Sequence, residues 1–413
     1  MQLYPYQREA VDELLAGKYI VCAGMGMGKT AMMMTWLKEK CEQTGKNKIL
    51  IVTTPSKRDS GDMEAEADEW NGKEWRASLS SFEVISWHGL AKWEKNLKFG
   101  EAKNYVFGFD EVAKAGAGIS SGMGTAFLKI TKQTRDWAGF TGTPGDTWMK
   151  FYPYFVATGK VRNKTAFRNR YVQEQTFKGF PEIVGYNFVD ELDRMWRDIA
   201  VIPDTSVVES QLPEETSKTI HFKTPTGYRD IIRTRRDKDG NLLETNMALC
   251  HYLRQACFSK QRQQWLSDFI ENLGTNCVFF CNYIEEEETL CEIAKKVLPD
   301  GAKVWRIDGS HHDIPTVETI GKYDIVVAHY ASGGEALNLQ FINYWVSVSP
   351  NYSYSVSKQA KGRIRRIGQR KPMFFFFCYS CDTIEESIMK CLKAKSDFAE
   401  RVWCEQNDIT EQS

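Results

Sequence analysis

Short apolar runs alternate with longer amphipathic stretches in two parts of the chain, before about residue 145 and after about residue 256. The apolar runs have the length and composition of buried strands, and the stretches between them have a helical period. The predicted strands are Tyr19–Cys22, Ile49–Val52, Phe82–Ile85, Tyr105–Phe109, Trp137–Phe140, Cys277–Phe280, Asp324–Val327, Tyr344–Val348 and Phe374–Cys378. Helices are predicted from about Lys29 to Cys41, through Trp265 and Phe269, and from about Ile384 to Arg401. Strands separated by helices predict an α/β fold with parallel sheets.

The stretch between these two parts breaks the alternation. It is rich in aromatic and basic residues, it contains Pro203 and Pro213, and residues 238–241 form a turn signal. We therefore predict three parts: a first α/β domain over 1–150, a mostly helical insert over 151–255, and a second α/β domain over 256–413. In the last of these, the acidic run Glu285–Glu288 is predicted as a solvated helix start, where the helix dipole favours acids.

Composition and charge exclude several classes of protein. The 413 residues are 42% hydrophobic and 26% charged, which is ordinary for a globular chain. Lysine plus arginine equals aspartate plus glutamate at 54 each, so nucleic acid would have to bind at local patches, such as residues 358–371 with seven basic residues and no acid. No apolar run reaches the roughly 20 residues of a membrane-spanning helix, and the first residues do not form a secretory signal. Eleven scattered cysteines indicate reduced thiols, and we predict a cytoplasmic protein.

A phosphate-binding loop follows the first predicted strand. Residues 23–30 read Ala-Gly-Met-Gly-Met-Gly-Lys-Thr and lead into a predicted helix. Glycines let backbone N–H groups surround phosphates, Lys29 would reach their oxygens, and the Thr30 hydroxyl would ligate Mg²⁺. The predicted cofactors are ATP and Mg²⁺, and the first-lobe residues predicted to bind them are Gly24, Met25, Gly26, Met27, Gly28, Lys29 and Thr30.

Two acids end the fourth predicted strand. Asp110 and Glu111 follow the apolar run Tyr105–Phe109. After a phosphate loop, such a pair is expected to divide the work, with Asp110 holding Mg²⁺ and Glu111 polarising the attacking water. Lys29, Asp110 and Glu111 are therefore the first three predicted catalytic residues.

The order of further motifs resembles the Swi/Snf-type DNA translocases of helicase superfamily two, in a compact form typical of prokaryotes or phages. The first half contains Leu3–Gln7, Ile51–Pro55 and Phe140–Pro144, the last reading Phe-Thr-Gly-Thr-Pro. The remaining motifs are Leu253–Cys257, Cys277–Tyr283, Arg306–Ser310, Ser332–Leu339 and Gln359–Gln369, which includes Arg-Ile-Gly-Gln. This resemblance implies two RecA-like lobes with a mostly helical insert between them.

The resemblance also assigns roles to further residues. Gln7 would read the adenine, and Arg363 and Arg366, three apart on a predicted helix face, would act as arginine fingers from the second lobe. Gly334 and Gln359 would complete the nucleotide site. The residues expected to contact the DNA backbone are Thr54, Ser56, Lys57, Ser332 and Gly333.

Three positions depart from the family pattern. Val112-Ala113 replaces Ala-His after the paired acids, Ala336 replaces a glycine, and Lys361-Gly362 is typical of general superfamily-two helicases. None of these changes removes a group needed for hydrolysis. They leave open how hydrolysis is coupled to nucleic acid, and to which subfamily the chain is nearest.

The predicted function is a DNA-dependent ATPase that translocates on double-stranded or branched DNA as a monomeric motor, without a membrane partner. One alternative is a strand-separating or branch-migrating helicase that acts on DNA forks or on RNA. Another is a binding module with a degenerate ATPase, which the missing histidine favours and the intact Lys29, Asp110, Glu111 and Arg366 oppose.

Overall fold

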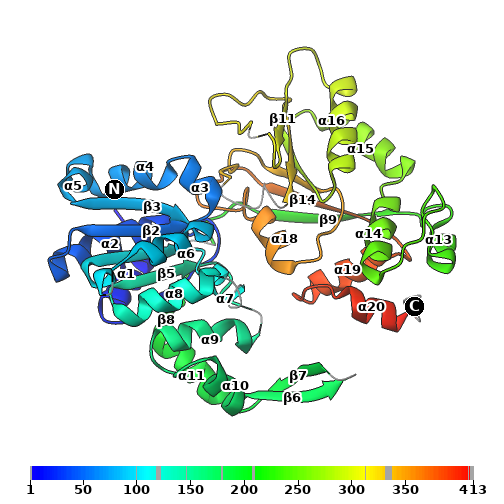
Figure 1. Cartoon of the computed structure of the whole chain (residues 1–413). Coiled ribbons are helices and arrows are strands. Elements are labelled where there is room, and N and C mark those ends of the chain that lie inside the picture. The colour runs from blue at the N-terminus through cyan, green and yellow to red at the C-terminus, as the bar shows by residue number, and fades with distance from the viewer. Residues whose placement is uncertain are drawn as a thin grey trace. The chain divides into compact units, whose positions relative to one another are not determined.

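The computed structural model of the chain describes residues 2–98, 100–117, 122–145, 147–177, 180–206, 210–311, 313–330, 337–407 and 409. By its internal contacts the chain divides into two compact units, Met1–Glu209 and Ser210–Ser413. Each unit is built around its own six-stranded sheet (Figure 1). No helix within the described ranges combines the length and the apolar character needed to cross a membrane.

The first unit has a parallel sheet with the strand order β3-β2-β4-β5-β1-β8. Its strands are β1 (Ile20–Cys22), β2 (Lys48–Thr53), β3 (Ser81–Ser86), β4 (Tyr105–Asp110), β5 (Trp137–Thr141) and β8 (Ala200–Val201). The five strands predicted for this part of the chain are confirmed. The two-residue edge strand β8, which pairs with β1, is too short to give a periodic signal.

Helices cover both faces of this first sheet (Figure 1). The helices of the unit are α1 (Pro5–Leu15), α2 (Lys29–Thr44), α3 (Pro55–Asp59), α4 (Asp62–Asn71), α5 (Lys73–Ser78), α6 (Trp87–Asn96), η1 (Glu101–Asn104), α7 (Ala113–Ala117), α8 (Gly122–Gln133), α9 (Trp148–Ala157), α10 (Lys164–Tyr171) and α11 (Val189–Ile199). On one face, α2 packs directly over β4, where Met33 and Leu37 lie against Gly108. On the other face, α6, α8 and α9 join the strands in one apolar core.

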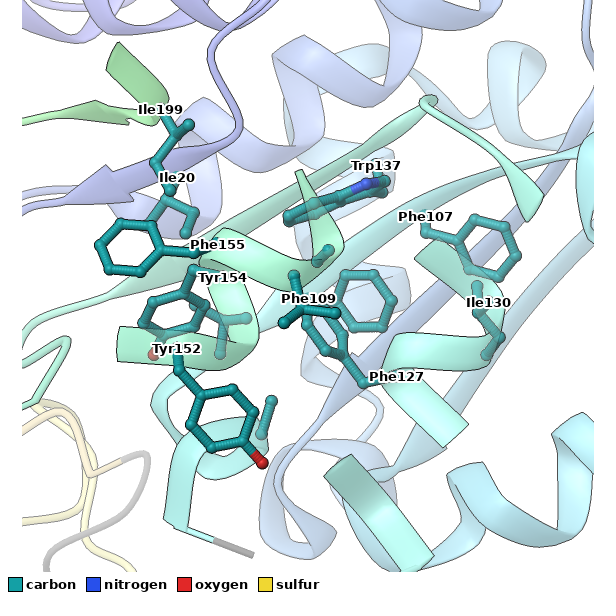
Figure 2. Close-up of a cluster of buried hydrophobic side chains, with 14 of the residues drawn as sticks. Ile20, Phe107, Phe109, Phe127, Ile130, Trp137, Tyr152, Tyr154, Phe155 and Ile199 are labelled. Carbon is teal, nitrogen blue, oxygen red and sulfur yellow. The ribbon is translucent and has the colours of Figure 1, made fainter. Parts of the chain in front are cut away.

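Aromatic rings dominate this core (Figure 2). Phe107 and Phe109 of β4 stack with their ring centroids 6.0 Å apart. Phe127 of α8 meets Phe109 edge-on at 5.0 Å and Trp137 of β5 at 5.5 Å. Such pairs each contribute about 0.5–1.5 kcal/mol beyond their burial. The cluster therefore fixes β4 and β5, which carry polar residues at their carboxyl ends.

The boundary between the two units falls inside the stretch predicted as a separate insert. Residues of α9 are part of the aromatic core of the first unit, among them Tyr152, Tyr154 and Phe155 (Figure 2). The same stretch contains an antiparallel hairpin of β6 (Val172–Phe177) and β7 (Phe180–Tyr186), which was not predicted. Helices α9, α10 and α11 remain its main elements before residue 209.

The second unit has a parallel sheet with the order β11-β12-β10-β13-β14-β9. Its strands are β9 (Glu215–Phe222), β10 (Cys277–Cys281), β11 (Val304–Ile307), β12 (Ile325–His329), β13 (Tyr344–Ser347) and β14 (Met373–Ser380). The helices with described bounds are α13 (Tyr228–Thr234), α14 (Asn246–Ala256), α15 (Lys260–Leu273), α16 (Ile284–Val297), α18 (Tyr354–Lys361), α19 (Ile384–Lys393) and α20 (Glu400–Gln406). Two parallel sheets flanked by helices, one in each unit, confirm the predicted α/β class.

The predicted last helix, from about Ile384 to Arg401, is wrong as one element. It is interrupted after Lys393, and α20 begins at Glu400. Lys395 has a φ of 59°, a left-handed conformation that ends a helix. The turn places Asp397 where its Oδ1 accepts the backbone N–H of Tyr354 at 2.7 Å, in the first turn of α18.

The acidic start of α16 is solvated as predicted only at Glu285 and Glu288, which are exposed. Glu286 and Glu287 are fully buried. Glu286 Oε2 accepts backbone N–H groups of Asn282 and Tyr283 at 2.9 and 3.3 Å and the Ser349 hydroxyl at 2.9 Å. These bonds satisfy donors that a helix start leaves open. Burial nevertheless raises the pKa of Glu286.

Candidate active site

The phosphate loop connects β1 to α2 in a conformation that depends on two glycines. Gly26 and Gly28 have φ angles of 73° and 72°, in the left-handed region that side chains disfavour. A Cβ at Gly28 would also lie 2.2 Å from Nε2 of Gln7, so the space is taken. Gly28 is the N-cap of α2, which leaves the first N–H groups of this helix directed along the loop.

Gln7 holds this loop from α1. Its Nε2 donates to the backbone oxygen of Met27 at 3.2 Å, and the Tyr6 hydroxyl donates to the same oxygen at 2.9 Å. Its Oε1 accepts the N–H of Tyr4 at 2.9 Å, as part of the cap of α1. The structure thus brings Gln7 to the phosphate loop, and adenine recognition by this residue stays a prediction.

Lys29 lies across the mouth of the loop. Its Nζ donates to the carbonyl oxygens of Ala23 and Gly24 at 3.1 and 3.2 Å. Gly142, in the motif Phe140–Pro144 at the end of β5, lies so close that a Cβ there would be 3.5 Å from this Nζ. This motif and the phosphate loop are therefore adjacent within one unit.

Asp110 is almost completely enclosed. Its side chain is 2% exposed, and its Oδ2 accepts the Thr53 hydroxyl and the Lys57 ammonium, each at 2.8 Å. Burial alone would raise the pKa of this carboxyl, but Lys57 and Thr53 outweigh it and hold the pKa below its ordinary value. Asp110 is therefore an ionised carboxylate at neutral pH.

Glu111 follows in an unusual backbone conformation. Its φ of 48° is left-handed, which costs a non-glycine residue about 1–2 kcal/mol. The Thr141 hydroxyl of β5 lies 3.5 Å from its Oε2, and this hydroxyl also accepts the N–H of Thr143 at 3.2 Å. Strain of this kind is typical of functional sites, and here it turns the chain directly after Asp110.

The donors gathered here fit a magnesium ion. Mg²⁺ prefers oxygen ligands and is usually bound by one or two carboxylates together with nucleotide phosphates. The Asp110 carboxylate and the Thr30 hydroxyl, in the first turn of α2, are ligands of this type. The ordering of strands places them in one region, since β1 and β4 both flank β5 and run parallel to it.

Lys57 forms an ion pair with Asp110, and its contact with the DNA backbone stays a prediction. Thr54 accepts the N–H of Lys57 at 3.5 Å as the cap of α3, and Ser56 is exposed. The sequence motif contains no signal for this ion pair. The ion pair follows instead from the pairing of β2 with β4, because the carboxyl ends of neighbouring parallel strands lie side by side.

In the second unit, the predicted arginines do not lie on a helix face. Helix α18 ends at Lys361, before both of them, so the predicted helical spacing is wrong. Arg363 is 7% exposed, and its backbone oxygen accepts the N–H of Leu339 at 3.2 Å. Arg366 donates through Nη1 to the Leu337 oxygen at 3.3 Å and to Asn338 Oδ1. Both arginines thus contact the segment that follows residues 331–336.

The other predicted residues of the second unit fall into three groups. Gln359 lies in α18 and is half-buried. Gly334, Ser332 and Gly333 lie outside the described residues. Gln369, the end of Arg-Ile-Gly-Gln, is buried and donates through Nε2 to the Ile342 oxygen at 2.8 Å, so it stabilises the turn after α18.

A polar cluster surrounds the motif Arg306–Ser310 at the end of β11. Nε of Arg306 lies 2.5 Å from Glu287 and 2.7 Å from Asp308, and Asp308 also accepts His311 Nδ1 at 2.9 Å. Burial raises the pKa of Glu287 to about 7, although Arg306 acts against it. This motif was predicted only by resemblance, and the structure gives it a role in holding α16 against β11.

Comparisons with known proteins give matches over parts of the chain and, in one case, over nearly all of it. No protein-family model matches the chain. The uncharacterized ATP-dependent helicase YqhH of Bacillus subtilis is 35% identical over 89 residues, 22% of this chain and 16% of the relative. Protein p41 of Acyrthosiphon pisum secondary endosymbiont phage 1 is 23% identical over 95% of both chains.

Among solved structures, the SWI2/SNF2 ATPase core of Sulfolobus solfataricus in complex with dsDNA has a TM-score of 0.43 and 14% identity. The match covers 96% of this chain and 91% of that one. The other curated relatives are much longer than the matched part, and the matches span less than a quarter of the length of each of them.

The phosphate loop beside Asp110 and Glu111, at the carboxyl edge of a parallel sheet, has the arrangement that is typical of nucleotide-binding α/β proteins. The order of motifs in both units resembles that of the Swi/Snf-type ATPases. A helicase and two DNA repair proteins are among the relatives that the chain matches. The chain is similar, over part of its length, to helicase-like ATPases of the Swi/Snf type.

Proposed function

We propose that this protein hydrolyses ATP in response to DNA and translocates on double-stranded or branched DNA. The observation that carries this proposal is the assembly of one edge of the first sheet. The phosphate loop with Lys29, the buried Asp110 with Glu111, and the loop after β5 lie at the carboxyl ends of three neighbouring parallel strands. This edge is where α/β proteins bind nucleotides.

Within this site each residue has a separate task. Thr30 and Asp110 would hold the magnesium ion, which neutralises charge on the β- and γ-phosphates. Lys29 would leave the carbonyl oxygens of Ala23 and Gly24 to reach the phosphates. Glu111 would orient the attacking water and accept its proton.

The second unit would supply positive charge and the path of the DNA. We propose that Arg363 and Arg366 act on the γ-phosphate, with Gln7, Gly334 and Gln359 contributing to nucleotide recognition. DNA would be bound mainly through its phosphates by local basic segments, since the chain has no net charge. We also propose that the protein acts as a monomer, and the similarity to a phage protein supports a place in the cytoplasm of an infected host.

Duplex or branched DNA is expected to raise ATP turnover at least about tenfold. Because phosphate contacts release counterions, the stimulation should fall steeply as salt rises from about 50 to about 200 mM. A coupled ATPase assay with linear duplex, forked DNA, single strands and RNA measures this, and a triplex-displacement assay then detects translocation. Greatest stimulation by RNA, or unwinding without triplex displacement, would instead favour the strand-separating helicase.

Glu111→Gln is expected to slow ATP turnover about a hundredfold while ATP binding is retained. The amide keeps the shape of the side chain but cannot accept a proton from water, and a general base contributes roughly 10²–10⁴ in rate. Turnover and binding of a fluorescent ATP analogue should be measured together. The matched control is Glu42→Gln on α2, an exposed glutamate outside the site, which should turn over normally. Turnover that is equal in both variants would contradict the role of Glu111, whereas a wild type without measurable turnover would favour a degenerate ATPase.

A further inference from the structure

Lys57 and Asp110 form an ion pair inside the site that should hold magnesium. The Nζ–Oδ2 distance is 2.8 Å, and the side chains are 20% and 2% exposed. The Thr53 hydroxyl donates to the same Oδ2, so that oxygen already has two donors. A cation that binds Asp110 must therefore share this carboxylate with an ammonium group or replace it.

The element that carries Lys57 is suited to movement. Helix α3 has five residues and no buried side chain, and it lies at the carboxyl edge of the sheet beside β3 (Figure 1). Its backbone is held at the start by the Thr54 hydroxyl at 3.5 Å from the N–H of Lys57. A surface helix with so little buried area opens at low cost in free energy compared with the core. Asp110, in contrast, lies at the end of β4, which the aromatic core fixes.

We propose that Lys57 is a positioning residue that competes with the divalent metal for Asp110, and that DNA relieves this competition by binding Lys57 through a backbone phosphate. The metal carries two positive charges, so an ammonium group at hydrogen-bonding distance from the same oxygen weakens its binding. A phosphate beside α3 offers the ammonium group an alternative partner of the same charge as the carboxylate. DNA binding would then prepare the metal site within one unit. The relief by DNA rests on the proposed function, whereas the competition itself does not.

The competition is tested by the Mg²⁺ concentration that gives half-maximal binding of a fluorescent, non-hydrolysable ATP analogue, without DNA. Lys57→Met removes the charge and should lower this concentration about tenfold. One opposite charge at this distance changes the proton affinity of a carboxylate by about the same factor or more. Lys57→Arg keeps the charge and should remain near the wild-type value. Arg58→Gln, on the same helix but paired with Asp59, is the matched control and should also remain there. Unfolding by heat checks that all variants are folded.

An unchanged or higher Mg²⁺ requirement in Lys57→Met would overturn the competition, because it would show that Lys57 only supports the site. Duplex DNA should lower the requirement in the wild type and have no further effect in Lys57→Met. A DNA effect of equal size in both would overturn the relief. If fluorescence anisotropy shows that the wild type does not bind DNA, the proposed function and the relief both fail. The comparison without DNA still decides whether Lys57 competes with the metal.

Discussion

Arg366→Ala is expected to reduce DNA-stimulated ATP turnover about a thousandfold. An arginine finger stabilises the negative charge on the transferred phosphoryl group, and its removal costs about 10³ or more in rate. Nη1 of Arg366 is held by the uncharged oxygens of Leu337 and Asn338, contacts that a phosphate can replace at small cost. Because the charge acts mainly in the transition state, binding of the ATP analogue should change far less than turnover. Single-turnover hydrolysis in the presence of duplex DNA measures the effect.

The neighbouring arginine provides the matched control. Nε of Arg365 donates to Oε2 of Glu215 on β9 at 3.0 Å, and Lys361 contacts the same carboxylate. Its charge is therefore used within the second unit, and Arg365→Ala should retain turnover within a few fold of wild type. Equal losses in the two variants would show a general effect of positive charge on DNA binding. Arg363→Ala is expected to impair both folding and turnover, because Arg363 is 7% exposed.

The strands and the first-unit residues of the site could be predicted because their signals are local. An apolar run of four or five residues between helical patterns gives a strand, and each of the nine predicted strands is found. The phosphate loop needs only left-handed glycines before a helix, and Asp110 needs only a position at the end of β4. Parallel strands then bring these residues to one edge without any further information in the sequence.

The features that the sequence did not predict depend on contacts between distant segments. Lys57 meets Asp110 because β2 pairs with β4, and Glu286 is buried because Ser349 and the N–H groups before α16 satisfy its carboxylate. Edge strand β9 is mostly polar, so its sequence gives no apolar run, and it forms by pairing with β14 over eight residues. A run of charged residues gives no indication of such partners, because the same run occurs on a solvated helix face and on a helix whose charged side chains are buried with partners.

The division of the chain shows the same limit. The composition of residues 151–255 differs from that of the flanking parts, which predicts a separate insert. Composition does not show where these residues pack, and α9 completes the core of the first unit, while β9 extends the sheet of the second. The boundary between the compact units therefore depends on long-range packing.

A buried ion pair supports the second unit, and breaking it is expected to cost about 3–5 kcal/mol of unfolding free energy. Arg262 of α15 and Glu385 of α19 are both fully buried and form two hydrogen bonds, at 2.5 and 3.0 Å. Arg262 also donates to the Val348 oxygen and to the Ser380 hydroxyl, each at 3.0 Å, which joins two helices to the ends of β13 and β14. Arg262→Met would leave the Glu385 carboxylate buried without its counter-ion. Urea unfolding followed by circular dichroism measures the loss.

Two further variants distinguish an unpaired charge from lost packing. The double variant Arg262→Met/Glu385→Leu removes both charges, and it should recover most of the loss, because the penalty comes from the charge left behind. Arg233→Ala breaks an exposed pair with Asp230 in the same unit, where the side chains are 77% and 66% exposed, and should cost less than about 1 kcal/mol. If the double variant is as unstable as Arg262→Met, the stabilisation comes from the shape and the additional hydrogen bonds of the arginine. The carboxylate of Glu385 would then be needed only to orient Arg262 toward Val348 and Ser380.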